Sequence, residues 1–488
     1  MTITVKRKKT RFYPNPKRVI AKFYMPIKED RAKVMVTNIL RLSEEEVSRM
    51  LARVLNDFSK RHRNISKIFE NNFNSLKEIL GNINNNKKPL SLKKKLLVGS
   101  YFTKEYSIES AAFFNPSIVE APDQSNLEEG QKRIIVSFRA TGEKHISSIV
   151  FRQGIIDKDN SLKFQTEGRL VDVPEIIKRY VYKKTIFLEK LSEMCIQKDV
   201  VNIVMDKLGK TFIYGELKQS IEETLKQVKV TPSKMKVIES LMWLARSHYE
   251  VKFSLDTAIS ERVLFPVSYA EVNGIEDARF VKFTDDNGKV TYYATYTAYD
   301  GFAILPKLMK TSDFNHFKVM PIHGEYAQNK GMALFPRKIN GKYAMIARSD
   351  GINNYIMFSD NINFWGSEEK IQEPLQSWEL IKIGNSGSPL ETEKGWLLIT
   401  HGVGPMRSYS LGALLLDKND PTNVIGRLAE PLLIPNEEER EGYVPNVVYS
   451  CGSIIHNNEL IIAYGMSDYA SGFASIPLDE LFEKLTNH

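Results

Sequence analysis

The chain has 488 residues, a length that favours more than one domain or one large repeat fold. Its 42% hydrophobic and 26% charged residues are typical of a globular protein with a substantial core. The net charge of +9 is modest because 59 acidic residues are mixed among 68 basic ones, and no basic stripe carries interleaved aromatic residues. We therefore expect no nucleic-acid partner, and the basic excess fits an anionic ligand or no ligand at all.

The two cysteines, Cys195 and Cys451, lie in segments of different character, which argues against a disulfide framework and against a cysteine metal site. The histidines are scattered, and neither H-x-x-x-H nor C-x-x-C occurs, so we expect no metal. No apolar stretch follows the charged N-terminus, and no run of 18 apolar residues occurs. We expect no membrane span and a cytoplasmic protein.

Residues 1–100 are predicted to form an N-terminal helical extension. Ser43 followed by Glu46 is a capping box, and the residues after it keep one apolar face. Residues 156–261 are predicted to form a helical insertion, with helices over 216–228 and 233–248. By default we assign the two helical regions a role in packing or in a homo-oligomer, and either could be a lid, a dimer interface or both.

The remaining residues, 101–155 and 262–488, carry a repeated β-pattern. Each unit has a strand, a tight turn of the hairpin type, a second strand, a polar break and a third strand. The units cover residues 115–152, 277–314, 331–360, 388–417 and 452–479. Strand-only repeats spaced mostly about 50 residues apart are typical of a propeller, whereas a two-sheet sandwich would not repeat this order five times. We predict a mainly β fold, a five-bladed β-propeller, with blade 1 in 101–155 and blades 2–5 in 262–488.

The stretch Val272–Phe283, V-N-G-I-E-D-A-R-F-V-K-F, places two carboxylates and a guanidinium at the mouth of a short apolar strand. Because side chains alternate along a strand, Asp277 and Arg279 are predicted to share one side and Glu276 to face away. Taken alone, this is the pattern of an ion pair at the end of a strand. The other repeats change that interpretation, because they carry polar residues in the same phase.

Polar residues recur at equivalent ends of the five units. The polar breaks supply Arg139 with Glu143, Asp300, Arg348 with Asp350, His401 and Asp468, and the starts of first strands supply Asn115, Asp277 with Arg279, and Lys330. Equivalent ends of radially arranged blades converge on one axis, so we expect these side chains to line a single funnel. Each residue taken alone is more simply explained as a structural turn residue.

Such a funnel suits a polyhydroxylated ligand, since hydroxyls take polar partners and sugar faces take aromatic rings such as Tyr409. Glycoside cleavage needs a carboxylic acid to protonate the leaving oxygen and, where water attacks, a second carboxylate as base. Carboxylates from different blades could hold the separation of about 6.5–9.5 Å that an inverting enzyme needs.

Six motifs resemble glycoside hydrolase family 130, in the family's own order. They are G-I-E-D-A-R (274–279), T-Y-T-A-Y-D-G (295–301), A-L-F-P-R-K-I-N-G-K-Y (333–343), E-K-G-W-L-L-I-T-H-G-V (393–403), L-G-A-L-L-L-D-K-N-D-P (411–421) and V-P-N-V-V-Y-S-C-G (444–452). The resemblance covers about 101–155 and 262–488. It implies a five-bladed propeller that acts on β-mannosides with inversion, by phosphorolysis in some members and by hydrolysis in others.

The resemblance also implies roles for single residues. Asp277 matches the family's general acid, which passes its proton through a sugar hydroxyl. Asn115, Arg139 and Asp468 match sugar-subsite positions, and we add Glu143, Arg279, Asp300 and Tyr409 as candidate substrate contacts. Lys330, Arg348 and His401 match, or lie beside, positions that meet phosphate in the phosphorylases.

Two departures from the family pattern bear on the choice of nucleophile. Ala278 stands where the family usually has proline, and 303–310 lacks the arginine that phosphorylases tend to carry there, with Lys307 as a candidate substitute. Phosphate needs several converging cations. The sequence therefore leans slightly towards hydrolysis, with Glu276, Glu325 and Glu143 as candidate bases.

Three hypotheses stand at this point: an inverting β-mannosidase, a β-mannoside phosphorylase with inorganic phosphate as co-substrate, and a non-catalytic glycan-binding propeller. In each case the partner is a short oligosaccharide, and no other cofactor is expected. The sequence leaves the linkage, the acceptor sugar and the oligomeric state open.

Overall fold

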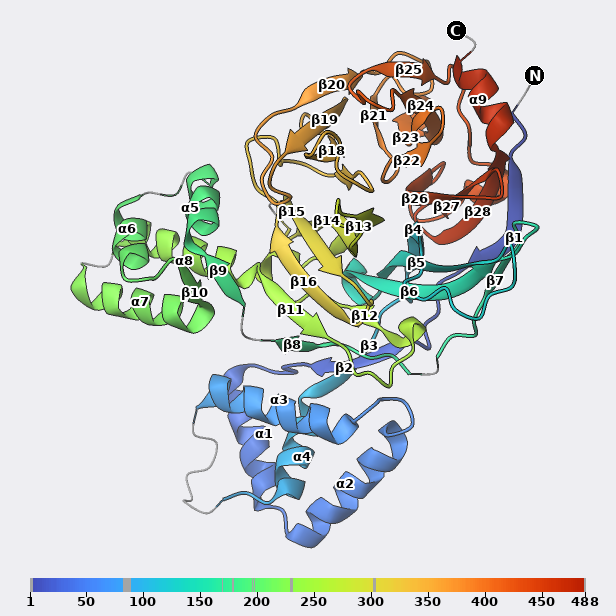
Figure 1. Cartoon of the computed structure of the whole chain (residues 1–488). Coiled ribbons are helices and arrows are strands. Elements are labelled where there is room, and N and C mark those ends of the chain that lie inside the picture. The colour runs from blue at the N-terminus through green and yellow to red at the C-terminus, as the bar shows by residue number, and fades with distance from the viewer. Residues whose placement is uncertain are drawn as a thin grey trace.

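The computed structural model describes residues 3–81, 89–168, 170–177, 180–194, 196, 198–228, 231–301 and 304–486. The fold is mainly β with helices added to it, as the sequence predicts. In Figure 1, five antiparallel sheets follow one another along the chain and lie around a common centre.

The first and second sheets come from 112–321. The first has the order β12–β6–β5–β4 with β7 beside β6: β4 (Ala112–Glu120), β5 (Lys132–Thr141), β6 (Ser147–Ile156), β7 (Leu162–Phe164) and β12 (Val263–Leu264). The second has the order β13–β14–β15–β16–β11–β8: β8 (Glu175–Ile177), β11 (Tyr249–Lys252), β13 (Ile275–Thr284), β14 (Val290–Tyr299), β15 (Ile304–Thr311) and β16 (His316–Pro321).

The other three sheets follow in chain order. The third is β17 (Ala333–Leu334), β18 (Tyr343–Ala347), β19 (Asn354–Ser359) and β20 (Glu369–Gln372). The fourth is β21 (Lys382–Asn385), β23 (Gly395–Val403), β24 (Tyr409–Leu416) and β25 (Val424–Arg427), with β22 (Leu390–Thr392) beside β23. The fifth is β26 (Val448–His456), β27 (Glu459–Met466), β28 (Ala470–Pro477) and β1 (Lys6–Phe12).

Each sheet packs on both of its neighbours through a buried apolar cluster, and the fifth packs on the first. Each cluster contains residues of both neighbouring sheets: Phe151 and Phe280, Phe283 and Met345, Ile346 and Leu398, Leu397 and Ile462, and Val136 and Ile461. Burial of these side chains stabilises the arrangement by about 1.5–3 kcal/mol per large apolar residue. The two faces of the alternating strands thus serve two different interfaces.

The N-terminal region is not wholly helical, so the prediction of a helical extension over 1–100 is wrong in part. β1 joins the fifth sheet beside β28, and β2 (Val19–Phe23) pairs with β3 (Thr103–Ser107). The sequence of β1, K-R-K-K-T-R-F, lacks apolar alternation, because the strand lies at a sheet edge and packs little of itself inward. The helices are α1 (Glu29–Arg41), α2 (Glu44–Phe58), which begins at the predicted Ser43 capping box, α3 (Ile65–Leu80) and α4 (Leu92–Tyr101).

The insertion contains α5 (Lys184–Glu193), α6 (Lys198–Asp206), α7 (Tyr214–Gln227) and α8 (Pro232–Arg246), with the small pair β9 (Val181–Lys183) and β10 (Thr211–Ile213). Its own apolar cluster holds these helices together. It is not purely helical, because β8 and β11 extend the second sheet.

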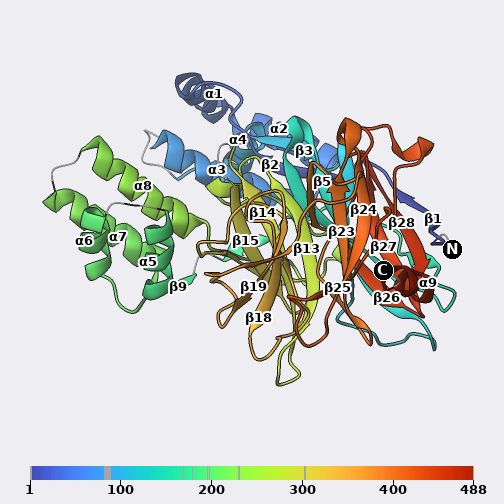
Figure 2. The same cartoon turned by 90° about the horizontal axis from the view of Figure 1, so that it is seen from above.

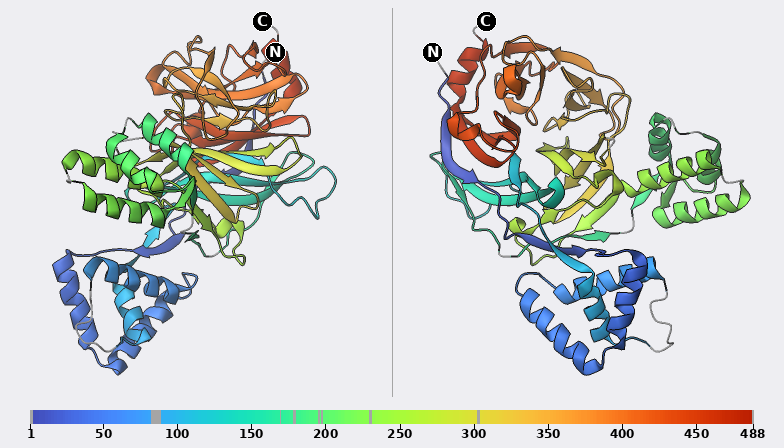
Figure 3. Two further views of the ribbon diagram at one scale, coloured as in Figure 1. Left: turned by 60° about the vertical axis from the view of Figure 1, so that its left-hand side comes forward. Right: turned by 180° about the vertical axis from the view of Figure 1, so that it is seen from behind.

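Figures 2 and 3 show α1–α4 and α5–α8 as two separate groups outside the ring of sheets, and α9 (Leu478–Thr486) beside the fifth sheet. Among the helices of the described ranges, none has the length and apolar character needed to cross a membrane.

Candidate active site

Three polar residues at one end of the sheets have left-handed backbones. Asn115 (φ 47°) lies in a bulge of β4, Asp277 (φ 52°) in a bulge of β13, and Asp468 (φ 51°) in the turn between β27 and β28. Positive φ is uncommon outside glycine, and bulges re-aim side chains beside active sites. The strands therefore end in strained segments at the place where the sequence predicts a funnel.

Arg139, near the end of β5, makes hydrogen bonds to residues at this end of both the first and the second sheet. Its Nη1 donates to Asp277 Oδ1 at 3.2 Å, its Nη2 donates to Glu276 Oε1 at 2.9 Å, and its Nε donates to Ser147 Oγ at 2.8 Å. Asn115 Nδ2 donates to the same Asp277 oxygen at 2.8 Å. These contacts join the first and second sheets around one carboxylate.

Glu276 does not face away from Asp277, so that prediction is wrong. Both carboxylates accept from Arg139, and Lys330 Nζ donates to Glu276 Oε2 at 2.7 Å. The reason is the β-bulge between Glu276 and Arg279, where the strict alternation of side chains breaks down.

A second group of residues continues from Arg279, which is almost fully buried. Its Nη2 donates to the Tyr449 hydroxyl at 2.6 Å, and the Tyr449 ring lies 4.8 Å from the ring of His401. Arg348 Nη1 lies 3.4 Å from His401 Nε2, and the Tyr409 ring stacks near that imidazole at 6.1 Å and lies 6.4 Å from the Tyr449 ring. Residues from the second to fifth sheets thus form one chain of contacts.

The charges of this group shift the pKa values of its members. Burial alone would raise the pKa of Asp277, but Arg139, Arg279 and the Asn115 hydrogen bond lower it below its usual value. Burial raises the pKa of Asp468 to about 6, with Asp277 adding to the rise and Arg139 opposing it. In the unliganded protein Asp277 is therefore ionised at neutral pH.

His401 is neutral for a related reason. Burial, and then the charges of Arg348 and Arg279, lower its pKa well below the usual value. With an arginine donor facing Nε2, the proton lies on Nδ1, which faces Ser386 Oγ at 3.3 Å.

Two of the candidate bases, Glu143 and Glu325, make their contacts outside this group. Glu143 is half exposed, and Lys104 Nζ donates to it at 2.7 Å. Glu325 is exposed, and its backbone oxygen accepts from Gln328. Asp300 directly follows β14, whose end pairs with the start of β13.

Lys307 cannot replace the missing arginine as a phosphate ligand. It is fully buried, and its Nζ donates to Glu271 Oε1 at 2.7 Å. Glu271 also accepts from the hydroxyls of Tyr249 and Tyr296. This cation neutralises a buried carboxylate inside the second sheet.

Sequence reasoning missed Tyr449 and Ser386 as members of the site. Tyr449 lies within the motif at 444–452, but tyrosines are common in the predicted strands and nothing singled this one out.

Cys451 is buried beside the site, and Cys195 lies outside the described residues. Across the described ranges, no three or more His, Cys, Asp or Glu side chains are grouped so as to hold a metal.

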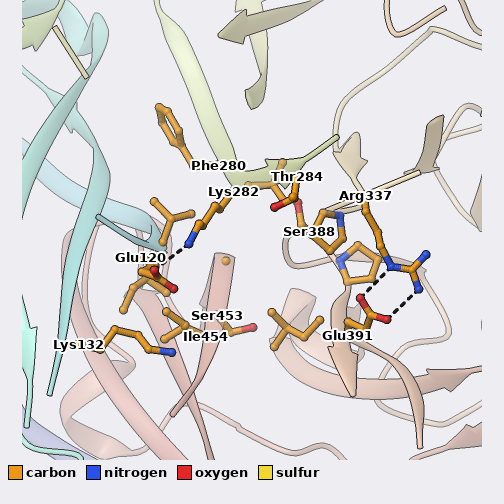
Figure 4. Close-up of a pocket in the computed structure, with 17 residues that line it drawn as sticks. Glu120, Lys132, Phe280, Lys282, Thr284, Arg337, Ser388, Glu391, Ser453 and Ile454 are labelled. Atoms are coloured by element: carbon orange, nitrogen blue, oxygen red, sulfur yellow. Dashed lines mark hydrogen bonds and ion pairs between the residues drawn. The ribbon is translucent and has the colours of Figure 1, made fainter. Parts of the chain in front are cut away.

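A cavity of about 330 Å³ lies at the opposite end of the same inner strands (Figure 4). Its charged residues are largely paired: Lys282 donates to Glu120 at 2.7 Å, and Arg337 makes two hydrogen bonds to Glu391. The residues that line the cavity do not include Asn115, Arg139, Asp277 or Asp468. The cavity is therefore separate from the polar cluster.

Comparison with known proteins places the chain in a family. The family profile described as β-1,4-mannooligosaccharide phosphorylase matches residues 233–487. The chain belongs to glycoside hydrolase family 130. The predicted resemblance is confirmed over 262–488, while 101–155 lies outside the matched residues.

Members of family 130 with similar sequences include a 1,2-β-oligomannan phosphorylase of Thermoanaerobacter sp. (strain X514), 36% identical over 43% of this chain and 71% of its own length. A β-1,2-mannobiose phosphorylase of Listeria innocua is 30% identical over 50% of this chain and 69% of its own. The solved structure of β-1,2-mannobiose phosphorylase from Listeria innocua with β-1,2-mannobiose covers 78% of this chain and 94% of its own, with 22% identity and a TM-score of 0.46.

Proposed function

We propose that this protein is an inverting β-mannoside phosphorylase, which cleaves short β-mannosides with inorganic phosphate and releases mannose 1-phosphate. The names of the similar proteins support this function rather than the slight preference for hydrolysis drawn from the sequence. The observation that carries the proposal is the set of cations around Asp277 and His401: Lys330 and Arg279 act on Asp277, and Arg348 lies beside His401.

The contacts of the three candidate bases also favour phosphorolysis over hydrolysis. Glu276 is held by Arg139 and Lys330 through both of its oxygens, so it is poorly placed to deprotonate a water molecule. The other candidate bases, Glu143 and Glu325, are respectively paired with Lys104 and exposed. Phosphate brings its own nucleophilic oxygen, and it needs cations rather than a base.

In the proposed reaction the mannosyl unit lies against Asn115, Arg139 and Asp468. Asp277 supplies the proton, through a sugar hydroxyl, to the glycosidic oxygen as the C1–O bond breaks. A phosphate oxygen, held by Lys330 and Arg348, forms the new bond to C1 from the opposite face, and the neutral His401 faces the Arg348 guanidinium and orients it.

The lowered pKa of Asp277 fits an ordered reaction. A general acid must be protonated at the moment of bond cleavage, and the arginines keep the unliganded carboxylate ionised. A bound phosphate dianion adds negative charge beside these arginines and so raises the pKa of Asp277. Phosphate thereby prepares the acid as well as providing the nucleophile, and it is the only co-substrate in the proposal.

We further propose that the five sheets are the blades of a five-bladed propeller, to which the α1–α4 group and the α5–α8 group are added. The sheet-to-sheet clusters that return from the fifth sheet to the first support this arrangement. The cytoplasmic location and a homo-oligomer through the helical regions stay predictions.

The proposal is tested by incubation with β-1,2- and β-1,4-mannobioses, with and without phosphate, followed by product analysis. We expect mannose 1-phosphate only when phosphate is present, and no turnover in Asp277→Asn. Asp313→Asn, which changes a turn aspartate on the outside of the second sheet, is the matched control and should retain turnover. Free mannose at a rate independent of phosphate would show a hydrolase, and no turnover in the unaltered protein would show a glycan-binding protein.

A further inference from the structure

A second cavity, of about 390 Å³, is lined by three exposed tyrosines. Tyr13 is 60% exposed, Tyr443 is 68% exposed and Tyr469 is 42% exposed. The rings of Tyr13 and Tyr469 lie 6.5 Å apart. A volume of several hundred Å³ with aromatic walls is typical of a small-molecule site.

This tyrosine cavity begins beside the polar cluster. Tyr469 directly follows Asp468, and its backbone oxygen accepts from Phe113 N, two residues before Asn115. Tyr443 lies on the loop that follows the short turn η5 (Glu437–Glu439), and its ring stacks on His145 at 4.8 Å. A ligand that contacts Asp468 can therefore extend towards these rings.

The rim of the tyrosine cavity carries carboxylates with no charged partner. Glu438 and Glu441 are exposed and make neither a side-chain hydrogen bond nor an ion pair with any residue that the structure describes. The neighbouring Glu439 differs, since it is buried and its carboxylate accepts hydrogen bonds from Arg7 Nε and the Tyr464 hydroxyl. In the cavity of Figure 4, by contrast, both acidic residues are paired.

We propose that the tyrosine cavity is an accessory subsite for a sugar unit of the bound oligosaccharide, distant from the bond that is cleaved. The C–H face of a pyranose packs on tyrosine rings, and its hydroxyls donate to Glu438 and Glu441. An anionic group is disfavoured there, because these carboxylates outnumber Arg11, the one guanidinium among the described residues that line the cavity, and Arg11 already contacts Glu439. The inference rests on the proposed function and adds to it a preference for chains longer than a disaccharide.

The test is the ratio of kcat/KM for a mannotetraose to kcat/KM for the mannobiose of the same linkage. Loss of one ring contact is worth about 1 kcal/mol, so Tyr443→Ala and Tyr13→Ala should each lower this ratio about fivefold. Tyr443→Phe and Tyr13→Phe keep the ring and should largely retain it. Tyr101→Ala, which removes a 42% exposed tyrosine at the end of α4, is the matched control and should leave the ratio unchanged.

A ratio unchanged in both alanine variants, or lowered equally by Tyr101→Ala, would overturn the subsite. Binding of mannotetraose to Asp277→Asn, measured by calorimetry with and without Tyr443→Ala, tests the subsite independently of turnover. If the unaltered protein shows no phosphorolysis, the proposed function fails, while this binding difference of about fivefold still decides the subsite.

Discussion

Lys330→Ala should raise the KM for phosphate while leaving the fold intact. Lys330 Nζ lies 2.7 Å from Glu276 Oε2, and its side chain is 39% exposed, so a phosphate ion can reach it. A hydrogen bond to a charged group contributes about 1.5–3 kcal/mol, and water screening favours the lower end for a side chain this exposed. A loss of about 1.4 kcal/mol corresponds to a tenfold rise in KM.

The assay is the initial rate of mannose 1-phosphate release at saturating oligosaccharide and varied phosphate. Lys318→Ala is the matched control, because Lys318 is 41% exposed and donates to one carboxylate, Glu250, at 2.8 Å on the outside of the second sheet. Its phosphate KM should equal that of the unaltered protein. An unchanged KM in Lys330→Ala, or an equal rise in Lys318→Ala, would refute the placement of phosphate beside Lys330.

Two further predictions concern buried charges. Lys307→Ala leaves the carboxylate of Glu271 buried without its cation, so the free energy of unfolding in urea at pH 7 should fall by about 3–5 kcal/mol, and Glu271→Gln in the same chain should restore part of it. A fall below about 1 kcal/mol would contradict this role for the pair. The raised pKa of Asp468 means that its contribution to stability is present below pH 3.8 and is lost as the pH rises through about 6. Asp468→Asn should therefore flatten the decline of Tm between about pH 4 and pH 6, and an unchanged decline would contradict the raised pKa.

The sequence predicts the inner strands better than the outer ones. The first three strands of each unit alternate apolar residues and are joined by recognisable hairpin turns, since both of their faces pack on neighbouring sheets. The fourth strands of the second, third and fourth sheets, β16, β20 and β25, are only four to six residues long and partly exposed, so they carry little pattern. β1 could not be assigned to the fifth sheet because its partner lies at the other end of the sequence.

The candidate site could also be predicted only in part. Its convergence could be predicted, because repeated units place equivalent strand ends together. The orientation of Glu276 could not be predicted, because it depends on a β-bulge in the backbone, and no residue in E-D-A-R indicates a bulge. The pairing of Glu143 depends on Lys104, which comes from the segment between α4 and the first sheet.

The pairing of β1 with β28 has a consequence for synthesis of the protein. At about 5–20 residues per second, a ribosome needs roughly 25–100 s to reach the last strand, and β1 remains without its partner for most of that time. An unpaired strand is a template for aggregation, and charged side chains, lysine above all, are one of the features that oppose it. Five of the seven residues of β1 are basic, so the nascent chain carries a strand that stays soluble until the final hairpin emerges to receive it.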